Sequence, residues 1–182
     1  MVDLVAAKRI PTNIDYASPT QFRLQITRLP NVEYFIVAAN IPDVSFSGEA
    51  EVNTPFKTFY NAGDILEYGD LTVKFMVNES LENWEEIYNW IKGIGFPHDR
   101  KEYPAMIAGS ELDPKKLFSE ATLTILTNKN NPVMQVVYKN LYPSALTGIE
   151  YDVQQTDTLS MASTATFKFS DIELRRIINS TT

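Results

Sequence analysis

The amino-acid sequence predicts a mainly β (α+β) fold, in which an antiparallel two-sheet sandwich or barrel carries one flanking α-helix and a long β-hairpin arm. Apolar residues recur at every second position in several segments, which is the period of a half-buried strand. A single segment has the period of an amphipathic helix, and it lies between two groups of strands. This order favours an antiparallel sheet pair over an alternating α/β fold.

The first predicted strands follow a region without periodicity. Residues 1–20 contain two prolines and predict an N-terminal arm, so that a single domain covers 21–182. Residues 22–27 alternate apolar and polar side chains, as a half-buried strand does. Residues 34–39 are apolar at nearly every position, which predicts a strand that is buried on both faces.

Residues 44–70 predict the long β-hairpin arm. Alternation over 44–52 is followed by an extended aromatic segment at 56–60, and turn-forming residues come after each segment. A two-stranded ribbon is only marginally stable by itself. The strand at 48–52 also lacks Pro and Lys, which commonly block an exposed strand edge. We therefore expect the arm to pair with another chain.

The predicted helix covers 81–92 and follows the cleanest strand of the sequence, at 71–77. Its apolar side chains form one stripe on a helical wheel, and its glutamates cluster on the other side. Asn78 or Ser80 is available as the N-cap, and Gly93 is expected to end the helix.

Trp90 lies at the far edge of the apolar stripe, roughly opposite Leu81, so we predict that it covers a second surface. We group it with the aromatic and edge residues of the arm as a candidate contact between subunits. The candidate contact residues are Phe46, Glu49, Val52, Phe56, Phe59, Tyr60 and Trp90.

The segments after the helix predict a loop and a second group of strands. Residues 93–118 show no sustained period, and a loop of this length usually serves a function or a partner. Strands at 121–127 and 133–139 are joined by turn-forming residues in a hairpin. The remaining expectations are a turn at 141–143, strands at 149–153 and 165–169, and an alternating tail at 172–178 that frays.

Composition excludes several classes of protein. The 182 residues are 44% hydrophobic and 21% charged, as in an ordinary globular domain. The lack of cysteine excludes a disulfide framework, a thiolate zinc site and a cysteine nucleophile. A formal charge of -7 disfavours tight binding to nucleic acid. We expect neither a signal peptide nor a membrane span, because the longest apolar run is far shorter than the ~20 residues that a spanning helix needs.

Catalytic chemistry has little support in the sequence. His98 would need an orienting acid and a nucleophile within reach, and the neighbouring Asp99 does not establish either, so we expect an ordinary loop histidine. No glycine-rich phosphate motif occurs. We predict no enzyme activity, no cofactor and no metal site. A carboxylate cluster with helical spacing predicts a solvated face and comprises Glu79, Glu82, Glu85 and Glu86.

Several of these segments together resemble the tail tube proteins of T4-like contractile phages. The resemblance covers about residues 20–175 and implies the tail-tube fold. The residues that carry it are the strand at 22–29, Ile41-Pro42, the arm from Thr54-Pro55-Phe56 to Ala62-Gly63-Asp64, the strand and turn at 71–79, Tyr88-Asn89-Trp90, the run from Val136 to Pro143, and the strand at 166–170.

The resemblance implies a structural role. Such subunits form homohexameric rings that stack into a tube, and their sheets join into a continuous inner barrel. The implied partners are further copies of the chain and the sheath, tape-measure and baseplate proteins, while DNA passes through the lumen without specific binding. The implied location is the tail of the virion, which assembles in the host cytoplasm. Tube-like baseplate proteins share the fold, so a tube initiator is an alternative to a tube subunit.

The acidity of the chain suggests a property of such a lumen. Six copies would carry roughly -42 charges per ring, and a lumen of the same sign would let DNA slide without sticking. This hypothesis depends on which charges face inward.

Two other classes of protein compete with this interpretation. A monomeric β-barrel or sandwich that binds a small ligand would have one deep apolar pocket. A hydrolase would use His98 with a carboxylate.

Overall fold

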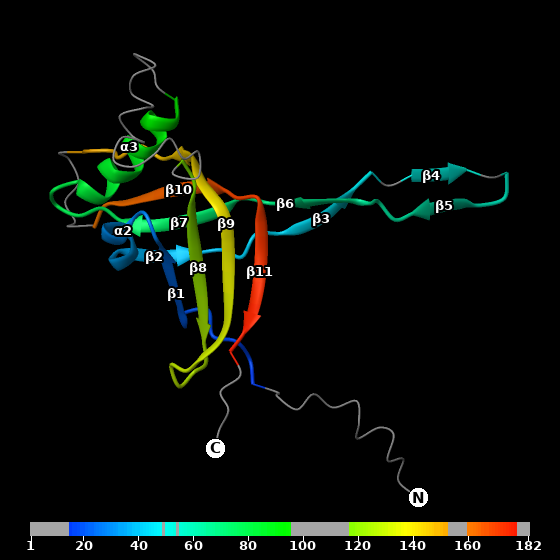
Figure 1. Cartoon of the computed structure of the whole chain (residues 1–182), viewed down its shortest axis with the longest axis horizontal. Coiled ribbons are helices and arrows are strands. Elements are labelled where there is room, and N and C mark those ends of the chain that lie inside the picture. The colour runs from blue at the N-terminus through cyan, green and yellow to red at the C-terminus, as the bar shows by residue number, and fades with distance from the viewer. Residues whose placement is uncertain (1–14, 49, 54, 96–116, 153–159, 178–182) are drawn as a thin grey trace, which may run out of the picture.

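The computed structural model describes residues 15–48, 50–53, 55–95, 117–152 and 160–177. These residues form a body of two sheets, helices beside the sheets, and a two-stranded arm that extends from the body (Figure 1). The strands are β1 (Phe22–Ile26), β2 (Ile36–Ala39), β3 (Val44–Ser47), β4 (Ala50–Asn53), β5 (Thr58–Asn61), β6 (Ile65–Tyr68), β7 (Leu71–Met76), β8 (Ser119–Leu126), β9 (Pro132–Leu146), β10 (Ala162–Lys168) and β11 (Asp171–Arg176). The helices are α2 (Pro30–Tyr34) and α3 (Glu82–Gly95).

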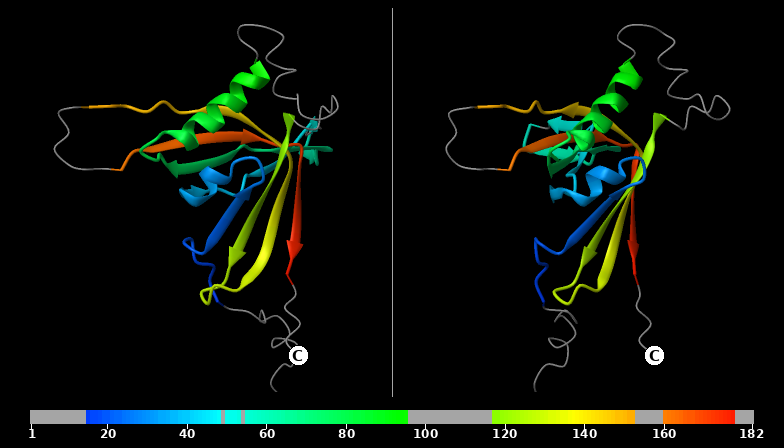
Figure 2. Two further views of the ribbon diagram at one scale, coloured as in Figure 1. Left: turned by 60° about the vertical axis from the view of Figure 1, so that its left-hand side comes forward. Right: turned by 90° about the vertical axis from the view of Figure 1, so that its left-hand side faces the viewer.

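Strand β9 joins the two sheets of the body. We name the sheet with the order β1-β8-β9-β11 sheet A, and the sheet with the order β9-β10-β7-β2 sheet B. All these pairs are antiparallel. The first part of the 15-residue β9 pairs with β8 and β11, and its last part pairs with β10. Figure 2 shows the strands of sheet B running across those of sheet A. The predicted mainly β, antiparallel two-sheet fold is confirmed.

Sheet A has one apolar and one polar face, because residues opposite each other on neighbouring strands point to the same side. Two rows across the four strands belong to the apolar face. They are Leu24, Leu123, Val136 and Leu174, and then Ile26, Ala121, Tyr138 and Ile172. The intervening row belongs to the polar face and consists of Gln25, Thr122, Val137 and Glu173, and the next row on this face is Arg23, Thr124, Gln135 and Arg175. Val137 is a buried apolar residue of this face.

The core lies between the apolar face of sheet A, sheet B and helix α3. On β7, Leu71, Val73 and Phe75 are fully buried while the residues between them are exposed, as the clean alternation predicts. Each such side chain contributes roughly 1.5–3 kcal/mol by leaving water. Trp90 of α3 is among the largest fully buried side chains and packs near Phe167 of β10, with ring centroids 6.2 Å apart.

Several boundaries differ from the sequence prediction. Residues 30–34 form α2 because Pro30 suits the first turn of a helix, so the following strand begins at Ile36. That strand is not buried on both faces: β2 is the outer strand of sheet B, and Val37 is 47% exposed. The predicted turn at 141–143 is wrong, since β9 continues through Pro143, which lies opposite Phe167 next to a shift in register.

The remaining segments also depart from expectation. Residues 149–152 are not in a strand, and Val153 lies outside the described residues. The supposed fraying tail forms β11, whose six residues pair with β9. Residues 96–116, which make up most of the predicted loop, lie outside the described residues, as do residues 1–14 of the N-terminal arm. The division into 1–20 and 21–182 therefore stays a prediction.

Helix α3 is fixed to the body by a buried asparagine near its start. The Asn83 side chain is fully buried; its Nδ2 donates to the carbonyl of Met76 at 2.7 Å, and its Oδ1 accepts from the backbone N–H of Asn78 at 3.3 Å. The Trp84 indole N–H donates to the Thr147 carbonyl at 3.2 Å. Gly93 does not end the helix, because it is buried within it and the helix continues to Gly95.

Replacing Asn83 by alanine is expected to lower the free energy of unfolding by about 2–4 kcal/mol, because the change removes both hydrogen bonds that the buried side chain makes with the part-buried Met76 carbonyl and Asn78 N–H. Urea denaturation followed by circular dichroism measures the loss as a lower midpoint. Asn89→Ala, at an exposed position of the same helix, is the control and should change stability by less than about 0.5 kcal/mol. Equal effects of the two changes would contradict this role of Asn83.

The hydroxyl of Tyr138, unlike the amide of Asn83, is buried without forming a hydrogen bond among the described residues. The side chain is fully buried, and burial raises the pKa of Tyr138 to about 12. Tyr138→Phe should therefore leave stability unchanged or raise it by up to about 1 kcal/mol, since an unpaired buried hydroxyl is costly. A loss of more than about 1 kcal/mol in the same urea experiment would show that this hydroxyl has a stabilising partner.

Candidate functional site

The arm is a ribbon of two strand pairs, in which β3 pairs with β6 and β4 pairs with β5. In the first pair, the facing residues Val44 and Tyr68, and then Phe46 and Leu66, share one side. On the other side, the Ser47 hydroxyl donates to Glu67 Oε1 at 2.7 Å. The ribbon is therefore apolar on one side and mainly polar on the other in this part.

The outer part of the arm is less strictly divided, because Tyr60 faces Glu51 on the side that also carries Asn53 and Thr58. Val52 lies opposite Phe59 on one side, while Asn53 lies opposite Thr58 on the other, where the Thr58 hydroxyl donates to Asn53 Oδ1 at 2.7 Å. Gly48 joins the two parts with a φ of 80°, a left-handed conformation that glycine adopts without strain. The arm extends away from the body in Figure 1, so the core of this chain does not cover it.

The arm brings together five of the seven predicted contact residues and leaves them exposed. Phe56 is the extreme case, with 99% of its surface accessible. Contiguous apolar side chains that face water usually mark an interaction surface. The exposed predicted residues are Phe46, Val52, Phe56, Phe59 and Tyr60. Glu49 lies outside the described residues.

The prediction for Trp90 is wrong, because the side chain is only 2% exposed in the single chain. Its indole N–H donates to the Leu117 carbonyl at 3.0 Å, and the guanidinium of Arg28 lies 4.9 Å from the ring centroid. The prediction from the helical wheel assumes that only one side of the helix is buried. In the structure, Leu117 and Arg28 contact Trp90 on a further side of α3, so the side chain is buried within its own chain.

The edges of sheet A form a second candidate surface, which the sequence analysis missed. Among the described strands, β1 and β11 are its outer strands. Leu174 of β11 belongs to the same apolar row as the fully buried Val136, yet it is 62% exposed. The alternation at 172–176 was the available signal, but it was interpreted as part of a fraying tail.

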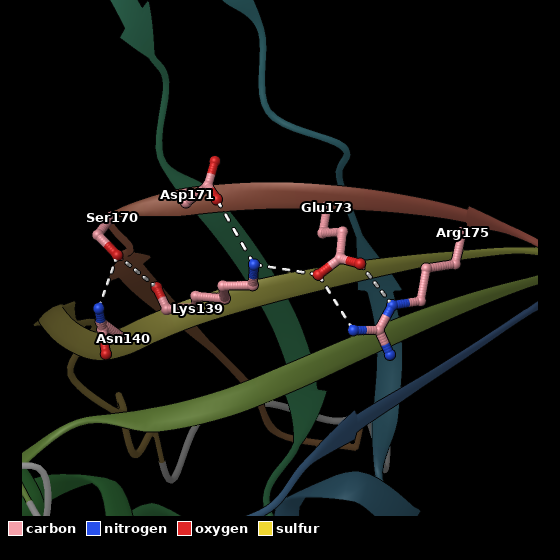
Figure 3. Close-up of polar contacts among 6 residues, drawn as sticks. All are labelled: Lys139, Asn140, Ser170, Asp171, Glu173 and Arg175. Carbon is pink, nitrogen blue, oxygen red and sulfur yellow. Dashed lines mark hydrogen bonds and ion pairs between the residues drawn. The ribbon is translucent and has the colours of Figure 1, made fainter.

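The polar face of sheet A carries an ion-pair network, which Figure 3 shows between β9 and β11. Lys139 Nζ lies 3.0 Å from Glu173 Oε2 and 3.7 Å from Asp171 Oδ2. Arg175 donates to both oxygens of Glu173, at 2.8 and 3.0 Å. The hydrogen bonds from Arg175 and Lys139 lower the pKa of Glu173 to about 2, and those with Glu173 raise the pKa of Lys139 and of Arg175.

Hydrogen bonds among Lys139, Asn140 and Ser170 fix the chain next to this network. Asn140 has a φ of 54°, and its Nδ2 donates to the Ser170 hydroxyl at 2.9 Å. The same hydroxyl donates to the Lys139 carbonyl at 3.2 Å, and the Ser170 N–H bonds that carbonyl at 3.0 Å. These contacts fix the position where β11 begins, and with it the alignment of its charged side chains on β9.

A groove of about 640 Å³ lies between the outer strands β1 and β2. Its lining mixes apolar residues such as Phe22 and Ile36 with the ion pair of Arg23 and Glu33, whose atoms are 3.3 Å apart. Tyr34 at its rim is 86% exposed. The groove therefore follows the open side of the two sheets and differs from the deep apolar pocket expected of a small-ligand barrel.

Metal-binding side chains do not gather in the described parts of the chain. No cluster of three or more His, Asp or Glu residues that suits a metal ion occurs among the residues at 15–48, 50–53, 55–95, 117–152 and 160–177. His98 lies outside them. The described helices also fall short of the length and hydropathy of a membrane-spanning segment.

Comparison with known proteins gives a consistent set of relatives. No family model matches the sequence. The chain is 24% identical over 166 residues to the tail tube terminator protein of Enterobacteria phage T4. The alignment covers 88% of this chain and 89% of the phage protein.

Solved structures show the same fold. The tube-terminating cap of the anti-feeding prophage aligns with a TM-score of 0.58 and 13% identity, over 97% of this chain and 100% of the cap protein. The sheath/tube terminator of the extracellular contractile injection system PVC aligns with a TM-score of 0.55 and 14% identity, over 90% of this chain and 99% of that protein. The predicted resemblance is thus confirmed: the sequence is similar to that of a phage tail tube terminator, and the chain shares the fold of tube-associated proteins of contractile systems.

Proposed function

We propose that this chain is the tube terminator of a contractile tail, a structural protein without enzyme activity that assembles as a ring at the end of the tail tube. The sequence match over most of both chains supports a terminator rather than the tube subunit or initiator expected from the sequence, since the fold alone does not separate these roles. The observation that carries the proposed ring is that the two outer strands of sheet A run in opposite directions and have no partner strand on their outer side among the described residues.

The direction of the strands in sheet A suits a ring. Because its four strands are antiparallel and even in number, β1 and β11 run in opposite directions. A rotation about the ring axis keeps the direction of every strand, so β11 of one copy meets β1 of the next in an antiparallel arrangement. This junction continues the alternation of the sheet around the ring, and closure removes the exposed edges.

The size of such a ring suits a conduit. Six copies contribute 24 strands of sheet A, and at about 4.8 Å between strands the wall has a circumference of roughly 115 Å and a diameter of roughly 37 Å before any tilt. The apolar face of sheet A packs on the core of its own chain, so the polar face lines the lumen. DNA passes along this face without specific binding.

The arm supplies contacts beyond the sheet. Its exposed aromatic residues include Phe56, which lies between β4 and β5, and the arm extends away from the body toward neighbouring subunits. The proposed partners are copies of this chain, the tail tube and the sheath, with tape-measure and baseplate proteins in the same tail. The protein belongs to the virion tail and assembles in the host cytoplasm. The monomeric ligand-binding alternative gains no support from the open groove beside β1.

The junction between β11 and β1 can be tested with Leu174→Pro. The Ile177 N–H donates to the Val133 carbonyl, so the alternation of an antiparallel ladder directs the backbone N–H of Leu174 away from β9. Proline at this position removes a hydrogen bond to the neighbouring copy and leaves the pairing with β9 intact. We expect a folded protein that does not form rings, as measured by size-exclusion chromatography with light scattering.

Leu174→Val is the matched control, because it keeps both the N–H and an apolar side chain, and it should still assemble. Rings formed by Leu174→Pro in the same amount as by the unchanged chain would contradict this junction.

The arm can be tested by removing residues 45–67 and joining Val44 to Tyr68 with Asn-Gly. These two residues face each other across the ribbon, so a two-residue turn can close the gap. We expect an unchanged midpoint of urea unfolding, because the core lies elsewhere, together with loss of higher assemblies in negative-stain images. Assemblies like those of the full chain would show that the arm is not a contact between subunits.

A further inference from the structure

We propose that Asp171 and Glu173 keep the polar face of sheet A from binding nucleic acid, by holding the two cations that would otherwise contact phosphates. This inference rests on the proposed function, in which the polar face lines the conduit. The ion-pair network of β9 and β11 would then prevent DNA from binding to the wall of the conduit.

The geometry places all four charged groups on one side of the sheet. Lys139 lies directly opposite Asp171 across the β9–β11 pair, and Asp171, Glu173 and Arg175 alternate along β11, so they share one face. Figure 3 shows the side chains of Lys139 and Arg175 converging on Glu173 from its two sides. Each cation thus has a carboxylate within 3.0 Å.

The charge of this face differs from that of the whole chain. The described residues of the face and its margin include three cations, Arg23, Lys139 and Arg175, against four carboxylates, Glu33, Glu120, Asp171 and Glu173. The face is therefore nearly neutral, at -1, although the chain carries -7. Much of the acidity lies elsewhere, for example on the exposed side of α3. The total charge of the chain suggested a strongly acidic lumen, but the charges on this face predict a lumen that is nearly neutral.

A nearly neutral face is expected to bind DNA only weakly. Affinity for DNA arises from cations that replace the counterions of phosphate groups. A cation held 3.0 Å from a carboxylate forms a dipole, and the fields of the two opposite charges largely cancel at distances well beyond their separation. Exposed ion pairs add little to stability, so their value here lies in this cancellation. The depressed pKa of Glu173 keeps its carboxylate ionised at neutral pH and in moderate acid.

The test compares two double variants with the same change in net charge. Asp171→Asn with Glu173→Gln leaves Lys139 and Arg175 without carboxylate partners on β11 and gives the face three cations against two carboxylates. Glu82→Gln with Glu85→Gln removes two exposed carboxylates from α3 and is the control. Rings of each protein, verified by negative stain, are titrated into a fluorescent DNA duplex of mixed sequence, and binding is followed by anisotropy.

We expect binding by the β11 variant alone. If one cation per subunit contacts a phosphate, its affinity should fall on the order of 10³-fold between about 50 and 200 mM salt. For the unchanged protein and the α3 variant, we expect DNA binding that is weak or too weak to measure. Tight binding by the unchanged protein, an equal gain in both double variants, or no gain in the β11 variant would overturn the inference.

The same comparison is decisive on unassembled protein, because the face is exposed in the single chain. Two freed cations per chain should then give an affinity that falls roughly tenfold over the same salt range. Failure of the unchanged chain to form rings would contradict the proposed function, whereas the difference between the two double variants decides this inference by itself.

Discussion

The unpaired backbone of the outer strands of sheet A is the constraint on which this structure depends. Within the described chain, β1 pairs with β8 and β11 pairs with β9, and the other side of each strand has no partner strand. An exposed edge recruits another strand unless it is blocked. Here the edge carries Leu174, an apolar residue that a neighbouring strand would cover. Pairing between copies satisfies both the backbone and this side chain.

Much of the fold followed from the period of the side chains. The alternation along β7, for example, needs no tertiary information, because every second residue must enter the core. Pro143 was misleading, since proline usually marks a turn but here lies within β9, beside a shift in register. Trp90 could not be placed from the sequence, because a helical wheel does not tell how many sides of a helix are covered.

The candidate surfaces were only partly accessible to sequence analysis. The aromatic arm was found because its length exceeds what a small body can cover, and the exposure of Phe56 and Tyr60 agrees with this expectation. The charged face was missed, since net charge is a property of the whole chain and carries no information on position. The pairing of Lys139 with Glu173 depends on the register of β9 and β11, which a single sequence does not specify.

A cryo-electron microscopy map of the purified assembly tests the central claim most directly. We expect a closed ring whose inner wall is a continuous antiparallel sheet, with β11 of each copy next to β1 of the following copy. Separate monomers at high concentration, or a ring in which sheet A faces outward and its edges remain free, would contradict it.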